Sequence, residues 1–200
     1  MIINPEQYNI ARRHVKNARI SVNHELQVKV VVPLWYKEKD LQQLVVEKQK
    51  WIQKQLAHFA ESKKDVPQLN PNEILYLGKG FDPGFDVTDR HMLHKWYLGK
   101  ALELYHSRIK MLSVKHGYFY NKLTLRNQKT RWGSCSKMKN ISLNWKLIKA
   151  PLQVIDYVIL HELTHTQFFA HSKTFWQKLS QVCPDYKGAL AWLKKYGGYL

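Results

Sequence analysis

The sequence predicts an α+β fold in which short strands and long helices follow one another in blocks along a chain of 200 residues. Three observations support this class. Residues 20–34 are rich in β-branched side chains, and residues 40–60 and 88–115 carry apolar side chains at helical spacing. Residues 118–147 contain three short strand-like runs, which precede an apolar helix. This length suits one domain with a sizeable core, or a domain with a small appended lobe.

The first part of the chain, residues 1–86, is expected to form an N-terminal lobe of strands with one helix. Residues 20–22 and 27–33 predict two strands, joined as a β-hairpin, from their β-branched content and partial alternation. Residues 40–60 predict a helix with one apolar face. A short strand is expected at residues 73–80, before a Pro-Gly turn.

The second part, residues 87–200, is expected to begin with a long helix. Thr88 and Asp89 can start it, and Gly117 can end it after about Lys115. We expect this helix to pack beside the later apolar helix. Three short strands separated by polar turns then predict a small sheet, at residues 118–125, 131–136 and 140–147.

Three further helices complete the prediction. Pro151 suits the first turn of a helix that is apolar on most faces, as in a buried element. Ser172 can cap a second helix that reaches Cys183, and a last helix is expected at residues 186–196, ending at Gly197.

The charge of the chain is strongly basic, with a formal net charge of +17 and an isoelectric point near 9.8. Such a balance favours polyanionic partners. Residues 118–149 contain no Asp or Glu, so their cations cannot neutralise one another, and we expect a basic surface that could bind nucleic acid or nucleotides. These cations are Lys122, Arg126, Lys129, Arg131, Lys137, Lys139, Lys146 and Lys149.

The N-terminal residues lack a charged start followed by an apolar run, and no stretch approaches the length needed to span a bilayer. We therefore expect a cytoplasmic protein without membrane contact. The two cysteines, Cys135 and Cys183, form no paired motif, so they predict small buried side chains rather than a disulfide framework or a zinc knuckle.

A His-Glu-Leu-Thr-His sequence lies at residues 161–165, near the end of the apolar helix. Side chains at positions i and i+4 lie one turn apart, so His161 and His165 can offer nitrogens to one ion. Glu162 would lie beside that ion, where it could take a proton from water. His171 follows the expected helix end and could supply the third ligand of a catalytic zinc site. The sequence therefore predicts one zinc ion per chain.

Four segments carry a recognisable set of motifs: RWGSC at 131–135, NISLNW at 140–145, VILHELTH at 158–165 and HSKTFW at 171–176. Together they resemble the YgjP-like metallopeptidase family, which is related to the SprT-like and WLM zinc peptidases. The resemblance implies a zincin-like domain with a small antiparallel sheet and an active-site helix, preceded by a lobe of hairpin and helix. It also implies zinc on His161, His165 and His171, with Glu162 as the general base.

The substrate side of this site is less defined. By resemblance, the strand with Arg131, Trp132 and Gly133 is the best candidate for holding an extended substrate through main-chain pairing. A structural bulge beside a core tryptophan would give the same sequence. Tyr186 is a candidate donor to an oxyanion. The connection at residues 167–170 is apolar, whereas a polar connection is expected in the family. This difference does not affect the expected metal ligands, but the shape of the entrance for substrate does not follow from the family pattern.

Three functions remain open at this stage. A zinc metallopeptidase acting on proteins or peptides agrees best with the motifs. A metal-dependent hydrolase of nucleotides or other phosphate compounds would use the same activated water, and the basic strands favour it. A nucleic-acid-binding module that cleaves proteins bound nearby would agree with the SprT-like resemblance. No oligomeric state follows from the sequence.

Overall fold

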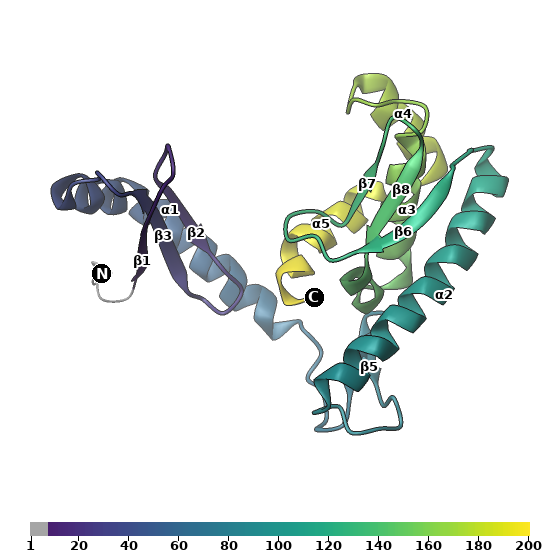
Figure 1. Cartoon of the computed structure of the whole chain (residues 1–200), viewed down its shortest axis with the longest axis horizontal. Coiled ribbons are helices and arrows are strands. Elements are labelled where there is room, and N and C mark those ends of the chain that lie inside the picture. The colour runs from purple at the N-terminus through teal and green to yellow at the C-terminus, as the bar shows by residue number, and fades with distance from the viewer. Residues whose placement is uncertain (1–7) are drawn as a thin grey trace. The chain divides into compact units, whose positions relative to one another are not determined.

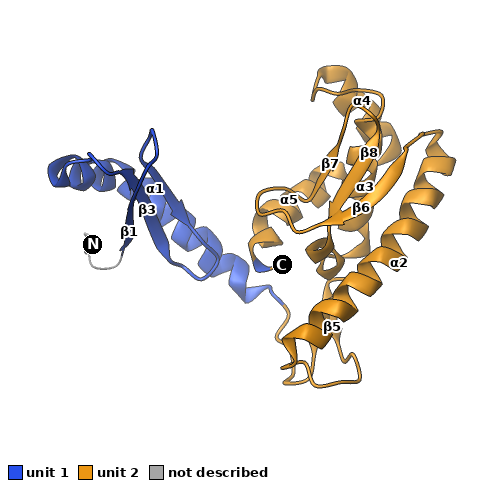
Figure 2. Ribbon diagram, in the orientation of Figure 1, with its two compact units in different colours: residues 1–66, 199 blue, residues 67–198, 200 orange. Residues whose placement is uncertain are grey.

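The computed structural model describes residues 8–200, which divide into two compact units (Figure 2). One holds the described residues up to Val66 with Tyr199, and the other holds Pro67–Gly198 with Leu200. Residues 67–86, which the sequence analysis assigns to the N-terminal lobe, thus pack in the second unit. Residues 1–7, on which the expectation about a leader peptide rests, lie outside the described part. Within residues 8–200, no helix combines the length and the apolar character that crossing a bilayer requires.

The first unit is a three-stranded sheet with one long helix (Figure 1). β2 (Arg19–Val22) and β3 (Val28–Pro33) pair antiparallel, so the expected hairpin is present. β1 (Tyr8–Arg13) adds to the other side of β3 in parallel and was not predicted. The apolar face of α1 (Glu38–Lys64) packs with the sheet in a small core that contains Val30, Val32, Leu41 and Ile52.

The second unit begins with a short hairpin. The single strand expected at residues 73–80 is in fact β4 (Ile74–Tyr76) and β5 (Lys79–Phe81), paired antiparallel. Leu77 and Gly78 both have positive φ, at 50° and 80°, and this turn ends the first strand early. Space is also limited there, because a Cβ built on Gly78 would lie 2.7 Å from Cγ of Pro151.

The long helix α2 (Arg90–His116) begins and ends where the sequence predicts. The Asp89 side chain accepts hydrogen bonds from the backbone N–H groups of His91 and Met92, and Gly117 ends the helix in the left-handed region, with φ of 69°. In Figure 1, α2 runs beside β6.

The sheet of the second unit contains β6 (Lys122–Arg126), β7 (Gly133–Cys135) and β8 (Asn140–Asn144), in the order β6-β8-β7. The expectation of an antiparallel sheet was wrong in one pair: β7 is antiparallel to β8, but β6 is parallel to it. β8 also ends earlier than expected, because Asn144 caps the 3-10 helix η2 (Trp145–Lys149) by accepting from the backbone N–H of Lys146.

The central helix α3 (Leu152–Thr164) lies against the sheet and α2, and its core side chains Ile155, Ile159 and Leu163 are fully buried. Arg108 of α2 donates to both carboxylate oxygens of Asp156, with Nε to Oδ1 at 2.8 Å. The expected packing of these two helices is therefore confirmed. The chain ends with α4 (Lys173–Val182), α5 (Tyr186–Tyr196) and the 3-10 turn η3 (Gly197–Tyr199).

Candidate metal centre

Three histidine side chains meet at the C-terminal end of α3. His161 lies in the last turn and His165 is the residue that follows the helix, so they are one turn apart on the same face. The chain then turns back and brings His171 to the same point, just before α4. The Nε2 atom of His165 is 3.2 Å from that of His161 and 3.1 Å from that of His171, and the remaining pair is also 3.1 Å apart.

This donor set fits a metal ion. Zinc bound tetrahedrally to imidazole nitrogens at about 2.0–2.1 Å keeps those nitrogens about 3.3 Å apart, close to the observed separations. Hydrogen bonds among the three Nε2 atoms cannot satisfy all of them. A single N–H can lie between any two of these nitrogens, and the lone pairs that receive no N–H then face each other. One cation bound by the three nitrogens would engage all three lone pairs. The residues therefore suit a metal held by three neutral imidazoles.

The protonation states agree with ligation. The Nδ1 atom of His165 lies 2.9 Å from the carbonyl oxygen of Phe168, and because a carbonyl can only accept, Nδ1 carries the proton and leaves Nε2 free. Burial, and then the neighbouring His165 and His171, lower the pKa of His161 to about 3. Burial also lowers the pKa of His165. A lowered pKa keeps an imidazole neutral, and the neutral form is the one that binds metal.

Aromatic side chains of α4 hold the histidine rings in place. Phe175 is fully buried, and the centroid of its ring lies 5.0 Å from that of His161 and 4.5 Å from that of His165. Trp176 stacks on His171 at 5.6 Å. Ser172 starts α4, as predicted, by accepting from the backbone N–H of Phe175. The sequence analysis did not assign Phe175 and Trp176 to the site, because apolar side chains at helical spacing are equally typical of a hydrophobic core.

Glu162 is the acidic group of this centre. Its side chain is buried at 5% exposure, and Oε2 has no hydrogen-bond partner among the described residues. Burial raises its pKa to about 8, an effect that the nearby guanidinium of Arg131 partly opposes. A buried carboxyl group on the residue that follows His161, with one oxygen free of partners among the described residues, has the chemistry of a proton acceptor.

The connection at residues 167–170 has a part in the site that its sequence does not reveal. The backbone carbonyl of Phe168 orients His165. The side chain of Phe168 packs against the core, whereas Phe169 is 60% exposed. A backbone contact leaves no mark on residue type, which is why sequence reasoning did not find it.

The predicted substrate residues lie in two places. Gly133 contacts Glu162. Arg131 and Trp132 both line a pocket near the end of α5, where Trp132 contacts Gly197. Tyr186 stacks on Trp176 with ring centroids 5.5 Å apart, and Trp176 in turn stacks on His171.

Comparison with known families decides the relationship of the chain. The sequence pattern of the YgjP-like metallopeptidase domain matches residues 16–83 and 85–196. The chain belongs to the YgjP-like metallopeptidase family. The resemblance inferred from the sequence motifs is thus confirmed, and it extends through both compact units of this YgjP-like chain.

Two solved structures resemble part of this YgjP-like chain, both titled as metallopeptidase zymogens. Abylysin of Pyrococcus abyssi is 22% identical over 42% of this chain and 86% of its own, with a TM-score of 0.39. Jannalysin of Methanocaldococcus jannaschii is 20% identical over 43% of this chain and 92% of its own, with a TM-score of 0.36. No curated protein sequence matches the chain.

Proposed function

We propose that this YgjP-like protein is a zinc-dependent peptidase that binds one zinc ion per chain through His161, His165 and His171. One observation carries the proposal: three imidazole nitrogens lie 3.1–3.2 Å apart, and the residue that follows the first of these histidines is the buried Glu162, whose Oε2 has no partner among the described residues. Family membership supports a peptide bond as the target, since the family is one of metallopeptidases.

The chemistry divides between the ion and the protein. Zinc, when bound, supplies a Lewis acid and makes water acidic enough to act as a nucleophile near neutral pH. Glu162 accepts the proton of the attacking water and passes it to the leaving amine. A cation close by also favours the carboxylate form of Glu162, which its burial alone disfavours.

The substrate is proposed to lie along β7. Among the described residues, β7 pairs with β8 on one side only, so its other edge can pair with an extended peptide. Arg131, Trp132 and Gly133 form the start of that edge. Tyr186 stays a proposed oxyanion donor, and Tyr186→Phe is expected to lower kcat at unchanged KM if its hydroxyl acts there.

The test is digestion of a proteome-derived peptide library by the zinc-loaded protein, with products identified by mass spectrometry. New peptide termini are expected with the wild type and not with Glu162→Gln, which keeps the shape of the site. Incubation with nucleoside triphosphates and sugar phosphates in parallel tests the other hydrolase function. Release of phosphate without any new peptide terminus would overturn the proposal.

A further inference from the structure

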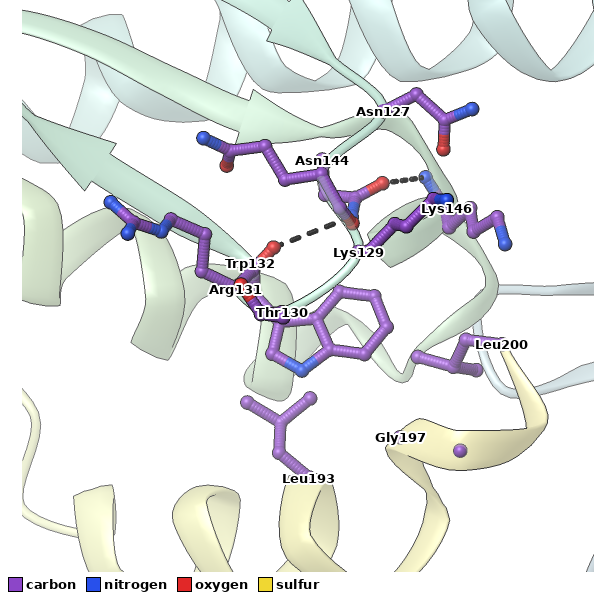
Figure 3. Close-up of a pocket in the computed structure, with 12 residues that line it drawn as sticks. Asn127, Lys129, Thr130, Arg131, Trp132, Asn144, Lys146, Leu193, Gly197 and Leu200 are labelled. Carbon is purple, nitrogen blue, oxygen red and sulfur yellow. Dashed lines mark hydrogen bonds between the residues drawn. The ribbon is translucent and has the colours of Figure 1, made fainter. Parts of the chain in front are cut away.

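A pocket opens in the second unit between the segment that leads into β7 and the end of α5 (Figure 3). Its cavity volume is about 450 Å³, which lies in the range of sites for small ligands. Figure 3 shows the indole of Trp132 directed toward Leu193 and Gly197, with Lys129 and Lys146 on the opposite side of the loop. The pocket thus has one apolar wall and one cationic rim.

The charged side chains of this pocket are all cationic. Lys129, Arg131 and Lys146 are the charged side chains that line it, and the segments 127–146 and 193–200 contain no Asp or Glu. Lys149 donates through Nζ to the oxygen of the pocket-lining residue Leu200 at 2.8 Å, and burial, with a smaller contribution from Lys146, lowers the pKa of Lys149 to about 8. The pocket therefore favours an anionic group on its occupant.

The wall of the pocket is held in place before any ligand arrives. Asn144 is buried, and its Nδ2 donates to the carbonyl oxygens of Gln128 at 2.8 Å and Arg131 at 3.4 Å. Its backbone N–H donates to the carbonyl of Trp132 at 2.8 Å. On the other side, a Cβ on Gly197 would lie 3.1 Å from the indole ring. A site fixed in this way loses little conformational entropy on binding.

The pocket also offers an unused acceptor. Oε1 of Gln128 is buried and has no hydrogen-bond partner in the part of the chain that the structure describes. A buried acceptor without a donor costs free energy unless a ligand or water supplies one. An occupant with an N–H group near its anionic end would satisfy it. A peptide segment that ends in or carries a carboxylate has both groups.

The direction of β7 connects this pocket to the metal centre. Gly133 contacts Glu162, and the residues that line the pocket begin at Trp132, directly before Gly133, and continue back along the chain to Lys129, four residues before Gly133. A peptide paired antiparallel with β7 runs toward the start of β7 at its carboxyl end. Parallel pairing would instead bring an amino terminus against the lysines, which is electrostatically unfavourable.

We propose that this pocket binds a carboxylate of a peptide substrate, about two to four residues beyond the cleaved bond on its carboxyl side. Lys129 and Lys146 hold the carboxylate, and Trp132 with Leu193 covers the apolar part of the segment. The carboxylate is either the chain end or an Asp or Glu side chain. This inference rests on the proposed peptidase function for its role, but the binding itself does not require turnover.

The test is calorimetric titration of the zinc-loaded full chain, with Glu162→Gln present in every sample to stop turnover. The probes are N-acetyl-tetra-alanine with a free carboxylate, its carboxy-terminal amide, and amidated peptides with glutamate or glutamine as the third residue. Lys129→Gln with Lys146→Gln is the test pair. Lys122→Gln with Lys137→Gln is the matched control, because it removes the same charge from the same acid-free stretch outside the pocket.

We expect the free acid to bind about 5–20-fold more tightly than the amide to the parent and to the control pair, and the ratio to fall to about one in the test pair. Preference for glutamate over glutamine in the amidated probes would assign the carboxylate to a side chain. If the test pair still binds the free acid more tightly than the amide, the carboxylate binds elsewhere, for example on the metal, and the proposal is overturned. Tighter binding of adenosine monophosphate than of any peptide would also overturn it. Carboxylate binding without cleavage of any peptide by the protein that retains Glu162 would leave the pocket assigned and reject the peptidase function.

Discussion

Gly133 lies directly against Glu162. A Cβ built on this glycine would lie 2.6 Å from Oε1 and 2.7 Å from Cγ of the glutamate, closer than any side chain can approach without displacement. The backbone of β7 thus forms one wall of the space that holds the carboxyl group. The glycine keeps the strand and the proposed general base in contact.

Replacing Gly133 by alanine should displace the Glu162 carboxyl group while leaving the three histidines in place. Because a misplacement of about 1 Å can lower a rate by about 100-fold, we expect kcat to fall by about 10–100-fold at unchanged zinc content. Ser134→Ala on the same strand is the control. Full activity in Gly133→Ala, with Glu162 unmoved in a crystal structure, would contradict this steric role.

Removing the proton acceptor should separate binding from chemistry. Glu162→Gln keeps the shape of the side chain, so zinc affinity should stay near that of the wild type while kcat falls by about two to four orders of magnitude. Metal analysis and peptide cleavage are measured on the same preparation. Loss of zinc together with activity would show that Glu162 acts as a ligand.

Removing the third imidazole should release the metal. His171→Ala leaves two nitrogens, and we expect it to lose zinc on dialysis against a micromolar chelator that the wild type withstands. His106→Ala, an exposed histidine on α2, is the matched control. Retention of zinc by His171→Ala would place the third ligand on another side chain, and Asp185, which follows α4, is the first acid along the chain after His171.

The pair between Arg108 and Asp156 should contribute to the stability of the second unit. Its side chains are 23% and 21% exposed and the contact is bidentate, so Arg108→Met should lower the free energy of unfolding by about 1–2 kcal/mol. Lys110→Met, exposed on the same helix, is the control. In a double-mutant cycle with Asp156→Asn, a coupling energy near zero would show that the loss comes from packing instead.

The acid-free stretch of residues 118–149 predicts binding to nucleic acid. Lys122, Arg126 and Lys129 are exposed, and phosphate contacts with them would release counterions, so affinity should fall log-linearly with salt. Their replacement by glutamine should flatten that slope without changing zinc content. If the wild type binds neither DNA nor RNA, single- or double-stranded, at about 50 mM salt, this prediction fails.

Local signals predicted the helices well. Asp89 and Gly117 mark the ends of α2 because their side-chain chemistry and backbone freedom act within one turn of the helix. The proximity of His161 and His165 follows from helical geometry in the same way. His171 required one more assumption, that the chain turns back after the helix, and the structure places its Nε2 beside the other two.

Features that depend on distant partners could not be predicted. β1 has a mixed polar sequence, and only its parallel pairing with β3 makes it a strand. The sequence indicates that Gly133 permits a close approach, but nothing in it names Glu162 as the neighbour. The hydrogen bonds from Asn144 to the loop before β7 are likewise tertiary, although an asparagine at a strand end does predict a cap.

The two three-stranded sheets share one topology, β1-β3-β2 and β6-β8-β7, in which the first strand is parallel to the third and the second is antiparallel to it. The antiparallel hairpin in each can form early in folding, because its loop is short. The parallel strand must close a longer loop and is expected to add later. We therefore expect the β7–β8 hairpin to form before the sheet is complete, so that the strand that contacts the proposed general base belongs to the part of its sheet that folds first.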